Sequence, residues 1–126
     1  MVARFTQIDY DREIALVAIL EEGPEEKMIG VARIIKENTP ETSEFAVLVA
    51  DSYHGRGIGA TLLKKCLFIA KDRNLPKVWG IVLAENTQML ALGRKLGFKI
   101  ERTRNAGEYL LSIDLQTLSM GDIAHK

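Results

Sequence analysis

Three alternating glycines separate an apolar, strand-like run from an amphipathic, helix-like run. The apolar run is Phe45–Ala50, and the helical pattern begins at Ile58. Because glycine has no Cβ, backbone N–H groups at such a turn can approach a phosphate at the helix N-terminus. The pattern therefore predicts a site for a phosphorylated ligand. The segment is Tyr53-His54-Gly55-Arg56-Gly57-Ile58-Gly59-Ala60.

Two ligand classes fit this turn, a dinucleotide and a pyrophosphate carrier such as coenzyme A. Gly55, Gly57 and Ala60 match the spacing of the dinucleotide fingerprint, and Glu85 follows at a distance loosely like that of the ribose-binding acid. In a Rossmann unit, however, the first glycine directly follows the strand, whereas here residues 51–54 intervene. The upstream sequence also predicts antiparallel hairpins instead of βαβ units. Coenzyme A is therefore the favoured class.

The first half of the chain predicts an antiparallel meander. Two strand-like runs, Glu13–Leu20 and Met28–Ile35, are joined through Gly23-Pro24. A third run, Glu44–Ala50, follows a polar loop.

The second half alternates helical and strand patterns. After the glycine turn, apolar residues recur at helical spacing, which predicts a helix packed on the sheet. Val78–Leu83 follows as a buried strand. Asn86 or Thr87 can cap a second helix that ends at Gly97. The last two strands are expected near 99–103 and 108–115, with a turn at 105–107. We predict one α/β (α+β) domain spanning residues 1–126.

Composition narrows the classes of partner. The chain has 17 Lys+Arg and 17 Asp+Glu, so no overall charge favours nucleic acid or an anionic membrane. No apolar stretch approaches the length of a membrane span, and a single cysteine excludes an internal disulfide framework. We expect a cytoplasmic protein. His54 and His125 lack metal-ligand spacing, so we predict no metal. Cys66 and Trp79 are assigned to packing.

Two ordered motifs resemble the GNAT N-acetyltransferase superfamily. His54–Gly59 occupies the place of the acetyl-CoA signature Gln/Arg-x-x-Gly-x-Gly/Ala, and Asn86 followed by Leu96-Gly97-Phe98 is similar to the family's later Asn…Leu-Gly-Phe element. The resemblance covers most of residues 3–115. More specifically, the chain is similar to the GNAT domain of bacterial protein lysine acetyltransferases. In those proteins this domain is often fused to an acyl-CoA synthetase-like region. The segments that carry it are Ala3–Glu13, Glu44–Val49 and Leu90–Phe98.

The resemblance implies a mixed, mainly antiparallel sheet with helices packed on it. The family's opening strand and first two helices would need more residues than precede Arg4, so Arg4–Asp11 is expected to be the tail of that missing region. The chain is then an excised domain or a shortened member. A fused acyl-CoA synthetase-like domain, or a second copy in a homodimer, could complete the acceptor side.

The resemblance also implies site residues for transfer of an acetyl group from acetyl-CoA to an amine. Glu44 stands where the related enzymes carry a catalytic glutamate; without the family, a solvent-facing strand-end carboxylate would be the simpler interpretation. The backbone of Val47, Leu48 and Val49 would pair with pantetheine. Amides from Gly55 to Ala60 (Gly55, Arg56, Gly57, Ile58, Gly59, Ala60) would hold the pyrophosphate, with Arg56 adding charge. Asn86 would contact the CoA arm, although a helix cap explains it almost as well.

Two positions depart from the family pattern. His54 replaces the usual Gln or Arg, which makes phosphate affinity weaker or pH-dependent. Gly93 stands where many relatives have a tyrosine that protonates the leaving thiolate, which leaves Tyr53, Tyr109 or solvent as donors. The acceptor is expected to be a protein lysine. The alternatives are a small-molecule amine acceptor and, from a different class, a non-catalytic acyl-CoA-sensing domain.

Overall fold

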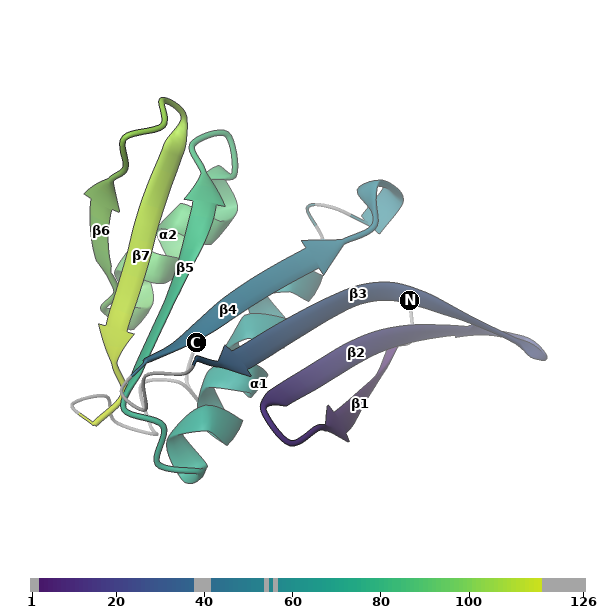
Figure 1. Cartoon of the computed structure of the whole chain (residues 1–126). Helices are drawn as coiled ribbons and strands as arrows, with labels where there is room; N and C mark the ends of the chain where they lie inside the picture. The colour runs from purple at the N-terminus through teal and green to yellow at the C-terminus, as the bar shows by residue number, and fades with distance from the viewer. Residues whose placement is uncertain (1–2, 38–41, 54, 56, 117–126) are drawn as a thin grey trace.

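The described part of the chain folds into one seven-stranded sheet with two α-helices and a short 3-10 helix (Figure 1). The computed structural model describes residues 3–37, 42–53, 55 and 57–116. The predicted mixed α+β fold is confirmed. The elements are β1 (Ala3–Asp9), β2 (Glu13–Glu22), β3 (Glu25–Lys36), β4 (Thr42–Val49), η1 (Asp51–Tyr53), α1 (Ile58–Asp72), β5 (Lys77–Leu83), α2 (Thr87–Leu96), β6 (Lys99–Arg102) and β7 (Glu108–Asp114).

The sheet has the strand order β1-β2-β3-β4-β5-β7-β6. Strands β2 to β4 form the predicted antiparallel meander, which β1 extends by one strand, and β5, β7 and β6 form a second antiparallel group. The two groups are joined by the parallel pair β4 and β5, which is connected through α1. Parallel neighbours need such a crossover connection.

The segment Arg4–Asp11, expected to be the tail of a longer N-terminal region, contributes a strand to the sheet. Ala3–Asp9 forms edge strand β1, which pairs antiparallel with β2 from Ala3↔Leu20 to Asp9↔Ile14. A tight turn closed by the Tyr10 N–H donating to the Glu13 carbonyl (2.8 Å) joins β1 to β2. The two strands therefore form a hairpin, with no helix between them in this described segment.

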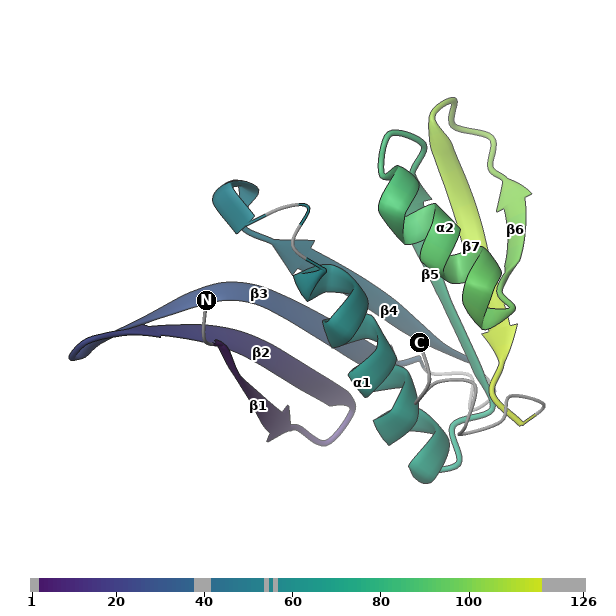
Figure 2. The ribbon, with the colours of Figure 1, turned by 180° about the vertical axis from the view of Figure 1, so that it is seen from behind.

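Both helices cover the same face of the sheet (Figure 2). Helix α1 crosses β2, β3 and β4, and α2 lies in front of β5 and β7 in this view. Neither helix in the described part of the chain is long and apolar enough to cross a membrane. The opposite face of the sheet carries no helix in the described ranges, so the core lies on one side only.

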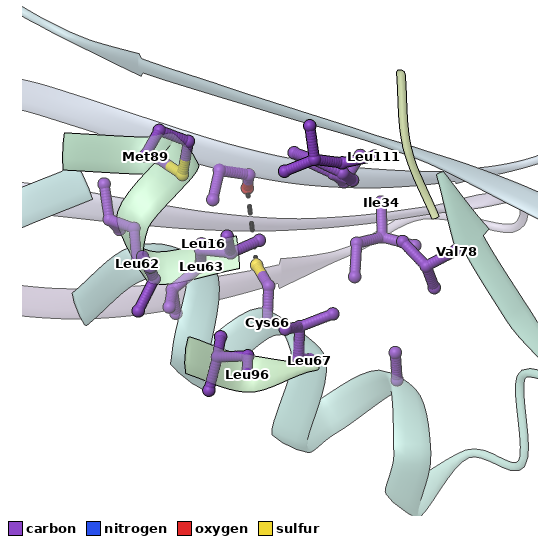
Figure 3. Close-up of a cluster of buried hydrophobic side chains, with 14 of the residues drawn as sticks. Leu16, Ile34, Leu62, Leu63, Cys66, Leu67, Val78, Met89, Leu96 and Leu111 are labelled. Atoms are coloured by element: carbon purple, nitrogen blue, oxygen red, sulfur yellow. Dashed lines mark hydrogen bonds between the residues drawn. The ribbon is translucent and has the colours of Figure 1, made fainter. Parts of the chain in front are cut away.

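The buried stripe of α1 forms the centre of the core (Figure 3). Leu62, Leu63, Cys66 and Leu67 are fully buried at helical spacing. The Cys66 thiol donates a hydrogen bond to the Ala32 carbonyl at 3.7 Å, and burial raises the pKa of this thiol to about 12. The assignment of Cys66 to packing is therefore confirmed by its position.

Phe45 joins the two groups of strands. Its ring packs edge-on against Phe98, which follows α2, with ring centroids 5.8 Å apart and planes at 70°. The same ring lies directly over Gly80 of β5, where an added Cβ would stand 2.5 Å from the ring. Gly80 therefore has to lack a side chain for Phe45 to lie between β4 and β5.

We expect Gly80→Ala to destabilise the protein by about 1–3 kcal/mol, because the new methyl group overpacks the Phe45 ring. Urea unfolding of wild type, Gly80→Ala, Phe45→Leu and the double variant measures this cost. In the Phe45→Leu background the same glycine change should cost less. Strict additivity of the two changes would contradict the contact.

We expect the Cys66 thiol to resist a thiol-specific reagent at pH 8 in the native protein, because a buried thiol with a raised pKa is almost entirely protonated. The same thiol should react promptly in denaturant. Absorbance of the released chromophore measures both rates. Equal rates in the two conditions would show that the α1 stripe is open to solvent.

Candidate functional site

Strands β4 and β5 pair only at their beginnings. The paired residues are Thr42↔Lys77, Ser43↔Val78 and Glu44↔Trp79, after which the two strands diverge (Figure 1). Beyond Glu44, β4 remains paired with β3 on its other side, up to Gly30↔Val49. The sheet is therefore open at the ends of β4 and β5.

A groove with a volume of about 710 Å³ lies at this opening. One wall comes from the end of β4, from Tyr53 and from the glycine turn into α1; the other comes from the end of β5 and the start of α2. The groove thus brings together segments far apart in the sequence. Its lining residues are Val47, Leu48, Val49, Tyr53, Gly55, Gly57, Ile58, Gly59, Ala60, Leu83, Glu85, Asn86, Thr87, Gln88, Met89 and Leu92.

Nine of the predicted site residues therefore line one groove, namely Val47, Leu48, Val49, Gly55, Gly57, Ile58, Gly59, Ala60 and Asn86. His54 and Arg56 lie outside the described residues. In the second wall, only Asn86, and Glu85 under the dinucleotide alternative, were singled out from the sequence. The exposed apolar end of β5, where Leu83 is 50% exposed, is the signal that could have indicated it.

The N-terminus of α1 lines the groove. Gly57 precedes the helix with φ 77°, a left-handed conformation that favours glycine. The first helical bond runs from the Thr61 N–H to the Gly57 carbonyl at 3.0 Å. The amides of Ile58, Gly59 and Ala60 precede that bond, so they have no partner within the helix. Together with the helix dipole, they form an environment suited to an anion.

Asn86 caps α2, as one of its two predicted roles requires. Its side-chain oxygen accepts a hydrogen bond from the Met89 N–H at 3.2 Å. The other end of α2 stops at Gly97, which has φ 93° and whose N–H donates to the Arg94 carbonyl at 3.1 Å. Both caps match the sequence prediction. Asn86 also lines the groove, so capping and ligand contact are compatible there.

Glu44 lies at the point where β4 and β5 separate, outside the groove lining. It is half-buried and is the last residue of β4 paired with β5. Its neighbours Ser43 and Phe45 are buried toward the helices. Because side chains alternate along a strand, the Glu44 carboxylate projects from the helix-free face of the sheet.

A second carboxylate is fixed close to Glu44. The indole N–H of Trp79 donates to Glu37 Oε1 at 2.6 Å, and the Thr42 hydroxyl donates to the same oxygen at 2.7 Å. Both hydrogen bonds lower the pKa of Glu37, and the one from Trp79 has the larger effect. Glu37 is therefore ionised at neutral pH. The sequence gives no local signal for this arrangement, which joins three strands.

Gly93 is a packing position. A Cβ added there would lie 2.7 Å from Leu111 Cδ2, so Leu111 would have to move to admit any side chain. The two tyrosines weighed as proton donors differ in place: Tyr53 lines the groove, and Tyr109 packs against the core. Among the described residues, no group of three or more His, Cys, Asp or Glu side chains could hold a metal ion.

Sequence comparison identifies relatives of this architecture. The Acetyltransferase (GNAT) family matches residues 2–98. Acetyltransferase PA5475 of Pseudomonas aeruginosa is 28% identical over 102 residues, which cover 81% of this chain and 55% of the relative. An uncharacterized N-acetyltransferase of Mycobacterium tuberculosis, Rv2669, is 29% identical over 102 residues, which cover 81% of this chain and 64% of the relative. The chain thus spans between half and two thirds of the length of these curated relatives.

Solved structures agree on the fold. The GNAT domain of S. lividans PAT superposes with a TM-score of 0.65 at 25% identity, covering 84% of this chain and 64% of that one. A mutant of the cAMP-binding acyltransferase from Mycobacterium smegmatis superposes with a TM-score of 0.71 at 24% identity, covering 91% of this chain and 33% of that one. The second likeness concerns the fold alone.

The family match extends from before β1 through α2 and ends at Phe98, so it includes the glycine turn, the diverging strands and the cap of α2. On this evidence the chain belongs to the Acetyltransferase (GNAT) family.

Proposed function

We propose that this chain is an acetyl-CoA-dependent N-acetyltransferase whose acceptor is a protein lysine side chain. The observation that carries the proposal is the groove at the divergence of β4 and β5, with the uncapped N-terminus of α1 on one wall and Glu44 where the strands separate. Membership of the GNAT family supports the use of acetyl-CoA.

Different segments of the groove suit the pyrophosphate and the pantetheine arm of coenzyme A. The amides of Ile58, Gly59 and Ala60, at the positive end of the helix dipole, suit the pyrophosphate. The backbone of Val47, Leu48 and Val49 lines the groove beyond the last pair of β4 with β5, and this position suits the amides of pantetheine. The predicted roles of His54 and Arg56 complete this proposal.

Glu44 acts as the general base in this mechanism. A lysine amine has a pKa of about 10.4 and is mostly protonated at neutral pH, so it must lose a proton before it attacks. Glu44 takes that proton, directly or through a water molecule. The nitrogen then bonds to the thioester carbonyl carbon, and the C–S bond breaks. The nitrogen, now bonded to the carbonyl carbon, loses its second proton to solvent, and the departing thiolate takes a proton from solvent or from Tyr53.

The lysine acceptor is the finer part of the proposal. It rests on the resemblance of Ala3–Glu13, Glu44–Val49 and Leu90–Phe98 to the GNAT domain of bacterial protein lysine acetyltransferases. The likeness to the GNAT domain of S. lividans PAT supports the GNAT architecture in which this acceptor is proposed. A small-molecule amine and a purely acyl-CoA-sensing role are the outcomes that the tests below separate from it.

We expect Glu44→Gln to lower the rate of acetyl transfer at least about a hundredfold, because removal of a general base commonly costs this much. The affinity for acetyl-CoA should stay unchanged, because Glu44 lies outside the groove lining. Calorimetric titration measures the affinity, with NAD as the control ligand. Release of free thiol with lysine peptides and with free polyamines measures the rate.

Glu101→Gln is the matched control, since Glu101 is an exposed carboxylate on β6. Full activity of Glu44→Gln would refute the base assignment. Binding of acetyl-CoA by the wild type without transfer to any amine would favour the sensing role. Binding of NAD in place of acetyl-CoA would refute the ligand assignment.

A further inference from the structure

Trp79 is held at its N–H end by a carboxylate. Its indole N–H donates to Glu37 Oε1 at 2.6 Å, and Thr42, which donates to the same oxygen at 2.7 Å, ties that carboxylate to the start of β4. The Glu37 N–H also donates to the Thr42 carbonyl at 3.3 Å. The indole is only half-buried. A fixed aromatic side chain therefore remains accessible on this surface.

Trp79 lies beside Glu44 on the same face of the sheet. The two residues are direct partners in the β4–β5 pairing, and neighbouring strands run about 4.8 Å apart. Val78 and Gly80, on either side of Trp79, are buried toward the helices, so Trp79 projects from the helix-free face as Glu44 does. The indole and the Glu44 carboxylate thus stand side by side where the sheet opens.

We propose that the Trp79 indole, held in place by Glu37, is a contact residue for the amine acceptor and guides its alkylammonium group to Glu44. This inference rests on the proposed function, in which Glu44 receives a proton from the acceptor. A flat aromatic ring next to a base suits a lysine-like chain, because the methylene groups pack on the ring and the ammonium group is attracted to its face.

The carboxylates around Trp79 suit the same ligand. Glu37 and Glu44 both lie on this face. The cations nearby are Lys77, opposite Thr42, Arg12, which donates to the Glu37 carbonyl at 2.8 Å, and Arg33, which is paired with Glu13. An ionised carboxylate on the indole N–H also polarises the ring toward greater electron density, which strengthens its attraction for a cation. A neutral acceptor of the same shape would gain only the packing contribution.

The emission of Trp79 tests the contact without turnover, because Trp79 is the only tryptophan in the chain. Nα-acetyl-lysine amide is titrated into the wild type with coenzyme A present, and Nα-acetyl-norleucine amide, which lacks the ammonium group, serves as the matched probe. We expect a saturable change of emission with the lysine probe and a much weaker response with the norleucine probe. Unchanged emission up to the solubility limit of the lysine probe would overturn the inference.

Kinetics separate this inference from the proposed function. We expect Trp79→Leu to raise the KM for the lysine probe about tenfold, with the KM for acetyl-CoA unchanged, and Trp79→Phe to restore most of the affinity because it keeps a ring. Glu37→Gln should raise the same KM less, and Glu22→Gln on the distant β2 end should have no effect. An unaltered amine KM in Trp79→Leu overturns the inference even if Glu44→Gln is inactive. Absence of transfer by the wild type, with the emission response intact, would refute only the proposed function.

Acid titration tests the Glu37 contact itself. The hydrogen bonds from Trp79 and Thr42 lower the pKa of Glu37, so the contact should persist as pH falls through the 4.5 of an ordinary glutamate and be lost below it. We expect a step in Trp79 emission in that acidic range, and no such step in Glu37→Gln. An identical step in both proteins would overturn the role of Glu37.

Discussion

The divergence of β4 from β5 is the constraint on which the rest of the site depends. The two strands of this seven-stranded sheet pair through Glu44↔Trp79 and then separate, while the rest of β4 stays paired with β3. On the helix side of this junction, the Phe45 ring fills the space that a side chain at position 80 would need. Phe45 and Gly80 therefore pack directly against each other there. An opening of this kind exposes backbone hydrogen-bonding groups that a continuous sheet would satisfy.

The surroundings of the opening divide its functions between two faces. On the helix side, the glycine turn and the N-terminus of α1 provide amides that suit an anion. On the opposite face, Glu44, Trp79 and Glu37 provide a carboxylate, an aromatic ring and a second carboxylate that suit a cation. A negatively charged carrier and a positively charged acceptor would thus approach the same junction from different sides. The GNAT family assignment implies two ligands of these kinds, acetyl-CoA and an amine.

Sequence reasoning predicted the elements whose signals are local. The apolar spacing of α1, the Asn86 cap and the Gly97 stop each depend on residues within a few positions of one another. The glycine turn likewise indicated most of one groove wall. Pairing between distant segments was harder to predict. The alternation of apolar and polar residues in Arg4–Asp11 is weak, and the position of β1 at the edge of the sheet depends on its pairing with β2. The bond between Trp79 and Glu37 spans 42 positions, so no local pattern could have distinguished it from packing.

Amide hydrogen exchange along β4, with and without coenzyme A, tests the central claim most directly. The opening accounts for ligand binding only if the ligand adds hydrogen bonds along Val47 and Leu48, which line the groove beyond the last pair of β4 with β5. We predict slower exchange in that segment when coenzyme A is bound, and unchanged exchange in Ala15–Ala18 of β2, which is paired on both sides. Exchange along β4 that coenzyme A leaves unaltered, at concentrations where calorimetry shows binding, would contradict the account.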